Sequence, residues 1–249
     1  MRFFFYIHPT RPQAESLREE AARILIKNGC EYTENPESAD FAISIGGDGT
    51  VVTTNQLCSK PIIGINAGTL GYLPKIEPQD MEKALCAVIR GEYSLENRMM
   101  LTCTAPGVKH VNALNDIVLQ KADQSVIRFT VTVDGVPLMR YTADGLIAST
   151  PTGSTGYSLS AGGPIVDPLS ELIVLTPLAP HTLLSRSIIL SAASRIALEC
   201  ENAAVISIDG NAYPISANSR FSIQKSTENA KFVTLSRESF VERLRKKLY

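Results

Sequence analysis

The sequence has no run of about 18 uninterrupted apolar residues, the length that a helix needs to cross a membrane. Residues 1–7 form only a short apolar run with one charge and no small-residue cleavage site, so a first β-strand is expected there and not a signal peptide. These absences predict a soluble, cytoplasmic protein with no membrane partner.

Cysteine and histidine are scarce. The chain has 5 cysteines, no two of them in a C-x-x-C pattern, and 3 histidines. An odd number of scattered cysteines favours neither a disulfide framework nor a structural zinc site, and it fits a reducing compartment. No metal-ligating side-chain cluster is therefore expected.

The chain also has almost no net charge, because its 24 basic and 25 acidic residues give a formal net charge of −1. General nucleic-acid binders usually carry a basic domain or stripe, so no nucleic-acid partner is expected. With 249 residues, 44% hydrophobic and 20% charged, the composition is that of a globular protein with one large domain or two modest ones.

Two common nucleotide-binding signatures are missing. The chain has no Gly-Lys dipeptide, which excludes the G-x-x-x-x-G-K-[ST] loop, and it has no G-x-G-x-x-G pattern. A phosphate site in this protein must therefore be built in another way.

The first third of the chain alternates strand and helix patterns, which is typical of a parallel sheet with loops at the carboxyl ends of its strands. Thr10 and Gln13 have the spacing of a capping box at a helix start. The predicted strands are Phe3–Ile7, Phe41–Ile45 and Pro61–Ile65, and the predicted helices follow residue 10, span 51–59 and begin near Met81.

From about residue 95 the pattern changes to short alternating strands separated by turns, beginning with a hairpin around Asp134-Gly135. The sequence thus predicts an α/β + β fold. An N-terminal Rossmann-like α/β domain spans residues 1–94, a C-terminal antiparallel β-rich domain spans 95–235, and a helical tail spans 236–249. Strands are expected at 127–133, 136–141, 188–190, 196–200, 205–208, 221–223 and 232–235.

The first candidate site is Gly46-Gly47-Asp48-Gly49-Thr50, which follows a predicted strand and precedes a predicted helix. Glycines permit positive φ and close approach to a ligand, and amides before a helix N-terminus suit a phosphate. A carboxylate there would be misplaced unless it binds a metal or removes a proton. The alternative is a surface turn, since Asp-Gly is a common turn dipeptide.

The second candidate site is the segment 143–164, in which Asp144-Gly145 precedes a strand and a loop rich in Ser, Thr and Gly follows. Its hydroxyl groups and Tyr157 would suit a polar, planar ligand. A flexible linker is the alternative, although Pro151, Tyr157 and Leu159 interrupt the composition of one. Asn115-Asp116 is a weaker candidate, and a hairpin turn accounts for Asp209-Gly210-Asn211.

The order of these motifs closely resembles the NAD kinase family. That pattern is G-G-D-G-T, then N-x-G-x-L-G-[FY]-L at residues 66–73, then N-[DE], then the long Gly/Thr motif from Asp144 to Pro164, then D-G-[QN]. The resemblance spans about residues 41–213. Diacylglycerol kinases, sphingosine kinases and, loosely, phosphofructokinases share only G-G-D-G-T. Three positions depart from the common family pattern. Many relatives have a basic residue in place of Thr69, Ala in place of Gly156 and Gln in place of Asn211.

The resemblance implies phosphorylation of the 2′-hydroxyl of the adenosine ribose of NAD to give NADP, with ATP or polyphosphate as donor and a divalent metal. We expect Mg²⁺ to arrive with the donor phosphates. The resemblance also implies a homodimer or homotetramer and a C-terminal tail that returns to the N-terminal domain.

Matched to the family motifs, Asp48 would be the general base, and Gly46, Gly47, Gly49 and Thr50 would bind phosphate. Asn115 and Asp116 would hold ribose hydroxyls. The remaining residues expected at the NAD site are Gly49, Asp144, Thr155, Gly156, Tyr157, Ser158, Ser160 and Asn211 together with Asp48.

Two alternatives stay open on the sequence. A lipid kinase would share the glycine-rich loop but would need a lipid groove or a membrane-binding patch. A non-catalytic dinucleotide sensor would be expected to have lost the acidic residue of that loop, whereas Asp48 is present.

Overall fold

The computed structural model describes the chain except residues 69–70, 74, 183–184, 236–238 and 249, so Thr69 and Leu70 of the N-x-G-x-L-G motif lie outside the described residues. The chain divides into two compact units. Unit 1 comprises residues 1–98 and 230–249, and unit 2 comprises residues 99–229. The domain bounds at 94 and 235 stay a prediction.

Unit 1 contains a parallel sheet with the strand order β2-β1-β3-β4. At its edge, Phe232 of β16 pairs in parallel with Ile62 of β4. Every residue of β3 and β4 is buried, as expected for parallel strands covered on both faces. The bounds are β1 Arg2–Ile7, β2 Glu31–Thr33, β3 Phe41–Gly46, β4 Ile62–Asn66 and β16 Ser219–Thr234.

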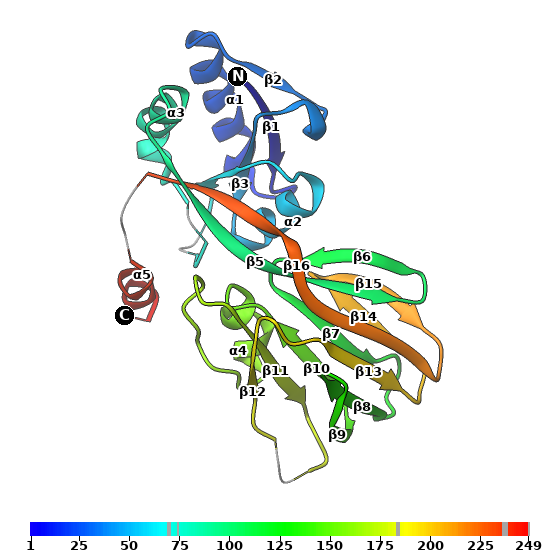
Figure 1. Cartoon of the computed structure of the whole chain (residues 1–249). Helices are drawn as coiled ribbons and strands as arrows, with labels where there is room; N and C mark the ends of the chain where they lie inside the picture. Colours follow the sequence, from blue (N-terminus) through cyan, green and yellow to red (C-terminus); the bar gives the residue numbers. More distant parts are fainter. Residues whose placement is uncertain (69–70, 74, 183–184, 236–238, 249) are drawn as a thin grey trace. The chain divides into compact units, whose positions relative to one another are not determined.

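Helices cover both faces of this sheet. Helices α1 and α3 lie on one face and α2 on the other (Figure 1). The buried faces of α1 and α3 pack on alternate strand residues such as Ile43 and Ile65 in one apolar cluster. The helices are α1 Pro12–Lys27, α2 Asp48–Leu57, α3 Met81–Ile89 and α5 Phe240–Leu248, with short 3₁₀ turns η1 Pro36–Ser38 and η2 Pro78–Asp80.

Two local predictions in this unit are wrong. Helix α2 begins at Asp48 and not at residue 51, so the glycine-rich loop itself forms the first helical turn. The capping box at Thr10 is absent, because α1 is preceded by Arg11, which makes no side-chain cap. Gln13 instead donates to the carbonyl oxygen of Ala67 at 3.4 Å.

Unit 2 is built from antiparallel strands. One sheet has the order β16-β13-β8-β9, and the other has the order β12-β11-β10-β7-β14-β15. The bounds are β5 Ser94–Ala105, β6 Val108–Ala113, β7 Asp116–Lys121, β8 Ile127–Val133, β9 Val136–Ala143, β10 Gly145–Ser149, β11 Leu172–Leu178, β12 Ile188–Ser191, β13 Ile196–Cys200, β14 Ala204–Ile208 and β15 Asn211–Ile215, with η3 Gly153–Thr155 and α4 Tyr157–Ser160.

The inner faces of these strands form one apolar core, in which the rings of Phe129 and Tyr141 stack with centroids 5.3 Å apart. The predicted hairpin around Asp134-Gly135 is confirmed, and both turn residues have positive φ, 51° and 81°. The separate strands predicted at 221–223 and 232–235 are one long strand, β16. The fold class predicted from the sequence is confirmed.

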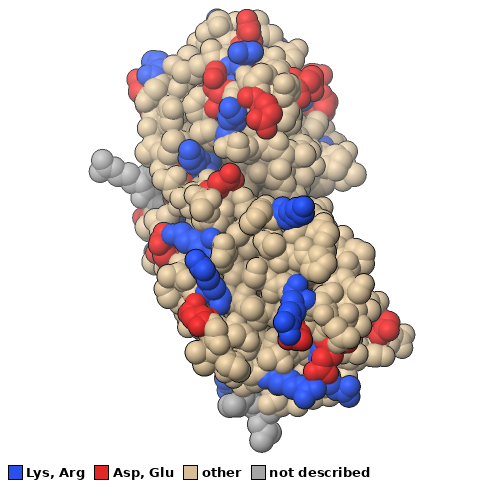
Figure 2. Space-filling model, turned by 45° about the vertical axis from the view of Figure 1, so that its right-hand side comes forward, with Lys and Arg blue, Asp and Glu red and all other residues tan. Residues whose placement is uncertain are grey.

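Surface features agree with the composition. None of the helices in the described part of the chain is long and apolar enough to cross a membrane. On the face shown in Figure 2, Lys and Arg side chains lie among Asp and Glu side chains.

Candidate functional site

The glycine-rich loop lies at the carboxyl end of β3, where β3 ends at Gly46 and α2 begins at Asp48. A Cβ on Gly46 would come 2.2 Å from Oγ1 of Thr50, so only glycine fits. The prediction that these glycines adopt positive φ is wrong: Gly46, Gly47 and Gly49 are not among the positive-φ residues, because the chain passes directly from strand to helix. A Cβ on Gly49 would meet nothing within 4 Å, which leaves the backbone there open to a ligand.

A pocket of about 380 Å³ surrounds this loop. The N–H groups of Asp48 and Gly49 belong to the first turn of α2 and have no partner within the helix, so they suit an anion. Arg11 and Lys247 add positive charge to the pocket wall. His8, Pro9, Tyr6 and Thr53 also line it.

These flanking residues were not predicted from the sequence. His8 and Arg11 follow β1, so the rule that ligands bind at the carboxyl ends of parallel strands could have found them. Lys247 comes from α5, far along the chain, and no local pattern marks it. Its Nζ lies 4.4 Å from the centre of the Tyr72 ring.

The Asp48 carboxylate is held by three donors. Oδ2 accepts a hydrogen bond from the backbone nitrogen of Tyr72 at 2.8 Å, and Oδ1 accepts one from the backbone nitrogen of Leu73 at 3.4 Å. The Nζ of Lys75 lies 2.7 Å from Oδ1. One third of the Asp48 side chain is exposed, against 5% of Lys75. These contacts fix the orientation of the carboxylate.

In unit 2, the Asp209 side chain organises the Asn115-Asp116 segment. Its carboxylate accepts hydrogen bonds from the backbone nitrogens of Leu114, Asn115 and Asp116 at 2.7, 2.8 and 3.1 Å. The Asp209-Gly210 hairpin turn is present, with φ of 46° and 87°. The interpretation that a turn fully accounts for Asp209 is nevertheless wrong, because its side chain fixes a strand 93 residues earlier.

Burial changes the acidity of both carboxyl groups in this cluster. Desolvation, assisted by the nearby charge of Asp209, raises the pKa of Asp116 to about 7. Burial also raises the pKa of Asp209, while its three backbone hydrogen bonds act in the opposite direction. Perturbed carboxyl groups of this kind are typical of functional sites.

Hydroxyl groups of the loop that follows β10 form hydrogen bonds within the protein. Thr150 Oγ1 donates to the carbonyl of Leu114 at 2.6 Å, and Ser154 Oγ donates to the carbonyl of Pro151 at 2.7 Å. Ser158 is buried, with its Oγ 3.2 Å from Oγ1 of Thr176. These three hydroxyl groups thus have partners within the protein, and two of those partners, Leu114 and Thr176, lie outside the loop. The place of Ser158 in the NAD site stays a prediction.

The loop can pack closely against Asn115 because two of its residues there, Gly153 and Gly156, have no side chain. A Cβ on Gly153 would come 2.1 Å from the backbone oxygen of Asn115, and one on Gly156 would lie 4.0 Å from both Asn115 Nδ2 and Asp116 Oδ2. Tyr157 is 47% exposed. The structure thus groups Asn115, Asp116, Thr155, Gly156, Tyr157 and Ser160 at one end of the β7–β10 pair.

Asp144 lies elsewhere in unit 2. In the antiparallel pairing, Ser149 stands opposite Asp116, whereas Asp144 precedes Gly145, which stands opposite Gln120. Five residues of strand separate the two aspartates, which is roughly 17 Å. Within unit 2, Asp116 and Asp144 therefore lie at opposite ends of the β7–β10 pair. Asp144 instead forms an ion pair with Lys121 at 2.8 Å.

Asn211 is the first residue of β15 and is exposed. It pairs with Ile208, which pairs on its other side with Ile117, so it lies at the Asp116 end of the sheet. Among the described residues, no group of three or more His, Cys, Asp or Glu side chains is arranged to hold a metal ion.

Family models match both parts of the chain. Residues 32–93 match the ATP-NAD kinase N-terminal domain, and residues 114–235 match the ATP-NAD kinase C-terminal domain. An NAD kinase from Caldanaerobacter subterraneus subsp. tengcongensis is 41% identical over 241 residues, which cover 92% of this chain and 85% of that protein. One from Lachnoclostridium phytofermentans is 38% identical over 85% of this chain and 81% of that protein.

Solved structures agree. An Archaeoglobus fulgidus NAD kinase in complex with ATP is 30% identical with a TM-score of 0.83, covering 100% of this chain and 97% of that one. Yeast NADH kinase complexed with NADH, at 24% identity and a TM-score of 0.91 over 100% of this chain and 87% of that one, shares the fold. The chain is thus an enzyme of the kinase class. It belongs to the NAD kinase family, and the lipid-kinase and sensor alternatives are not favoured.

Proposed function

We propose that this enzyme transfers a phosphoryl group from ATP or polyphosphate to the 2′-hydroxyl of the adenosine ribose of NAD and forms NADP. The observation that carries the proposal is the Asp48 carboxylate, held by two backbone amides and an ammonium group beside an open glycine-rich helix N-terminus. Family membership and the relatives named NAD kinase support the same reaction.

The donor phosphates would bind in the pocket around the glycine-rich loop. Unpaired first-turn amides and the positive end of α2 attract the phosphate oxygens, and Arg11 and Lys247 add charge. Phosphoryl transfer needs mainly in-line positioning and charge neutralisation, and the cationic side chains and helix N-terminus of this pocket would supply the charge neutralisation.

Asp48 would act as the general base. The carboxylate accepts the proton of the attacking hydroxyl group as the new O–P bond forms, and a positioned base of this kind contributes about 10²–10⁴ in rate. One third of the Asp48 side chain is exposed, which leaves room for the attacking hydroxyl group. The backbone donor to Oδ2 fixes the orientation of the carboxylate toward it.

NAD would be bound by the cluster at the Asp116 end of unit 2. Asn115 and Asp116 are held in place by Asp209 and are suited to ribose hydroxyl groups. The exposed ring of Tyr157 offers a flat apolar surface to a base. Thr155, Gly156, Ser160 and Asn211 would complete this surface, with Ser158 as internal support.

A divalent ion, Mg²⁺, would enter with the donor phosphates. Mg²⁺ usually binds through one or two carboxylates together with substrate phosphates, so the donor phosphates would supply most of its ligands. When bound, the ion neutralises charge on the transferred group. A homodimer or homotetramer, a cytoplasmic location and a place for Asp144 in the NAD site stay predictions.

The test is a coupled assay. The purified protein is incubated with NAD, Mg²⁺ and either ATP or polyphosphate, and NADP is detected with an NADP-specific dehydrogenase. We expect NADP with at least one donor and none without Mg²⁺. Parallel reactions with diacylglycerol and sphingosine should give no phosphorylated lipid. Absence of NADP with both donors would overturn the proposal.

A further inference from the structure

Lys75 is a buried cation. Its side chain is only 5% exposed, and within the described residues Asp48 is the one carboxylate that lies within 4 Å of its amine. Burying an ammonium group is strongly unfavourable unless an opposite charge compensates it. The Asp48 carboxylate is therefore the opposite charge that compensates Lys75, and Lys75 in turn contacts that carboxylate from one side.

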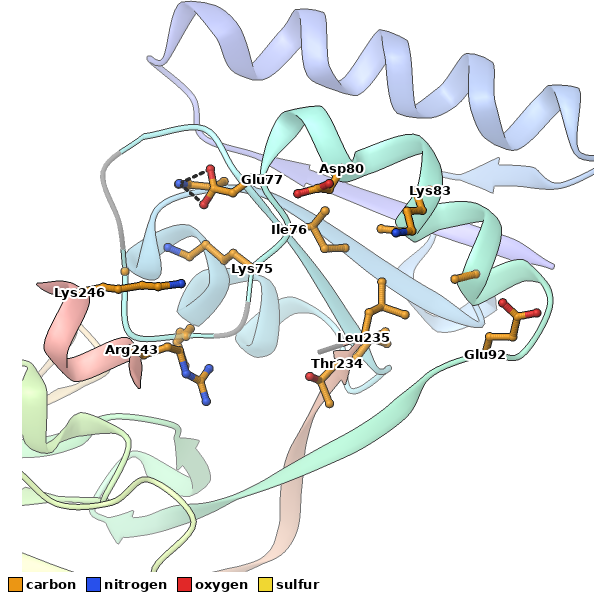
Figure 3. A pocket seen from close by; sticks show the side chains of 16 residues that line it. Lys75, Ile76, Glu77, Asp80, Lys83, Glu92, Thr234, Leu235, Arg243 and Lys246 are labelled. Atoms are coloured by element: carbon orange, nitrogen blue, oxygen red, sulfur yellow. Dashed lines mark hydrogen bonds between the residues drawn. The ribbon is translucent and has the colours of Figure 1, made fainter. Parts of the chain in front are cut away.

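The two side chains of this pair belong to different hollows of unit 1. Asp48 lines the glycine-rich pocket, whereas Lys75 lines a separate cavity of about 730 Å³ beside α3 and α5. Gly71 lines both. Figure 3 shows the Lys75 side chain in the second cavity, with the hydrogen-bonded carboxylate of Glu77 drawn beside it. Lys75 thus reaches Asp48 from behind the pocket that would hold the donor.

The backbone makes space for this contact. A Cβ on Gly71 would come 2.1 Å from Oδ1 of Asp48 and 2.4 Å from Nζ of Lys75. The absence of a side chain at Gly71 is therefore what allows the carboxylate and the ammonium group to meet.

We propose that Lys75 is a positioning residue for Asp48: its ammonium group holds Oδ1 from the rear, so that the other oxygen faces the substrate hydroxyl. This inference rests on the proposed function. A protein cation at Oδ1 also fills the position that a metal ion would need in order to bind Asp48 there. In this arrangement Lys75 acts on the reaction through Asp48.

The first test removes the positive charge of Lys75 and keeps a side chain of similar length. Lys75→Met is expected to lower kcat by about 10- to 100-fold, because a misplaced catalytic group costs rates of that order. The KM values for NAD and ATP are expected to stay within about threefold, since Lys75 binds neither. Lys75→Arg keeps a cation and is expected to retain most of the activity. Lys83→Met is the matched control, because Lys83 lines the same cavity from α3.

The second test separates a charge effect from a packing effect. Lys75→Ala leaves room beside the large cavity, so added propylamine, which replaces the lost atoms and charge, is expected to raise kcat several-fold. Propanol, of similar shape and uncharged, is expected to have no effect. Circular dichroism and thermal unfolding confirm that each variant is folded.

The outcomes are distinct. Loss of kcat in Lys75→Met, retention in Lys75→Arg and rescue by propylamine support the inference. Wild-type kcat in Lys75→Met, or equal responses to propylamine and propanol, overturns it and leaves the kinase function intact. Absence of NADP formation by the wild-type enzyme overturns the proposed function and this inference together.

Discussion

The carboxylate of Asp209 accepts a hydrogen bond from the backbone nitrogen of Asp116 at 3.1 Å, and its charge helps to raise the pKa of the Asp116 side chain. Asp209 therefore has two effects on its neighbour. It fixes the backbone of the segment that would meet NAD, and it makes ionisation of the Asp116 carboxyl group harder.

The raised pKa predicts a pH-dependent stability. Burial raises the pKa of Asp116 from an ordinary value of 3.8 to about 7, so the folded protein binds this proton more tightly than the unfolded chain does. The resulting stabilisation is complete below about pH 4 and is lost as the pH rises to about 7. The free energy of unfolding of the wild type, relative to Asp116→Asn, is expected to fall over this range by at most about 1.4 kcal/mol per pH unit.

Urea unfolding at pH 4, 5, 6, 7 and 8 measures this difference. Asp123→Asn is a matched control, because Asp123 is exposed and its Oδ1 accepts a hydrogen bond from the backbone nitrogen of Ser125, which Asn can preserve. That variant is expected to show no such pH dependence. A constant difference between the wild type and Asp116→Asn would contradict the assigned pKa.

A second prediction concerns the fit of the hydroxyl-rich loop against Asn115. Gly153→Ala would place a Cβ 2.1 Å from a backbone oxygen that cannot move easily, and it is expected to cost about 1–3 kcal/mol and to raise the KM for NAD. Gly156→Ala meets its nearest atom, the Gly153 oxygen, at 3.2 Å and is expected to cost much less. Thermal unfolding and KM measurements compare the two. Equal effects would show that the close approach at Gly153 is unimportant.

Gly49 offers a third prediction, in which stability and activity change in opposite directions. A Cβ there meets no protein atom within 4 Å, and the residue lies in the first turn of α2. Gly49→Ala is expected to stabilise the fold by about 0.4–1 kcal/mol, through the unfolded chain. If donor phosphates approach this backbone, the same methyl group raises the KM for ATP and leaves the KM for NAD nearly unchanged. Denaturant unfolding and initial rates test both parts, and an unchanged KM for ATP would argue against phosphate binding at Gly49.

Much of the fold could be predicted from local sequence patterns. Strands alternating with helices indicated the parallel sheet of unit 1, and short strands with turn residues indicated the antiparallel sheets of unit 2. The glycine-rich loop could be located because it follows a buried strand directly. The predicted start of the second helix was wrong, because α2 begins at Asp48 and includes it in its first turn.

The supporting residues of the site could not be predicted in this way. Lys75 meets Asp48, and Asp209 meets Asn115, only after the chain has folded, and neither contact leaves a periodic or spaced pattern in the sequence. Composition also cannot tell whether a hydroxyl group faces inward. Thr150 and Ser154 donate to the backbone oxygens of Leu114 and Pro151, because buried polar groups must find partners.

The most direct test of the central claim is the turnover of Asp48→Asn. The amide keeps the size and one acceptor oxygen of the carboxylate, but it cannot accept the proton of the attacking hydroxyl group. We predict that kcat for NADP formation falls at least ~100-fold, with modest change in the KM for NAD or ATP, and circular dichroism checks that the variant is folded. Near-normal turnover of the folded variant would contradict the assignment of Asp48 as the general base.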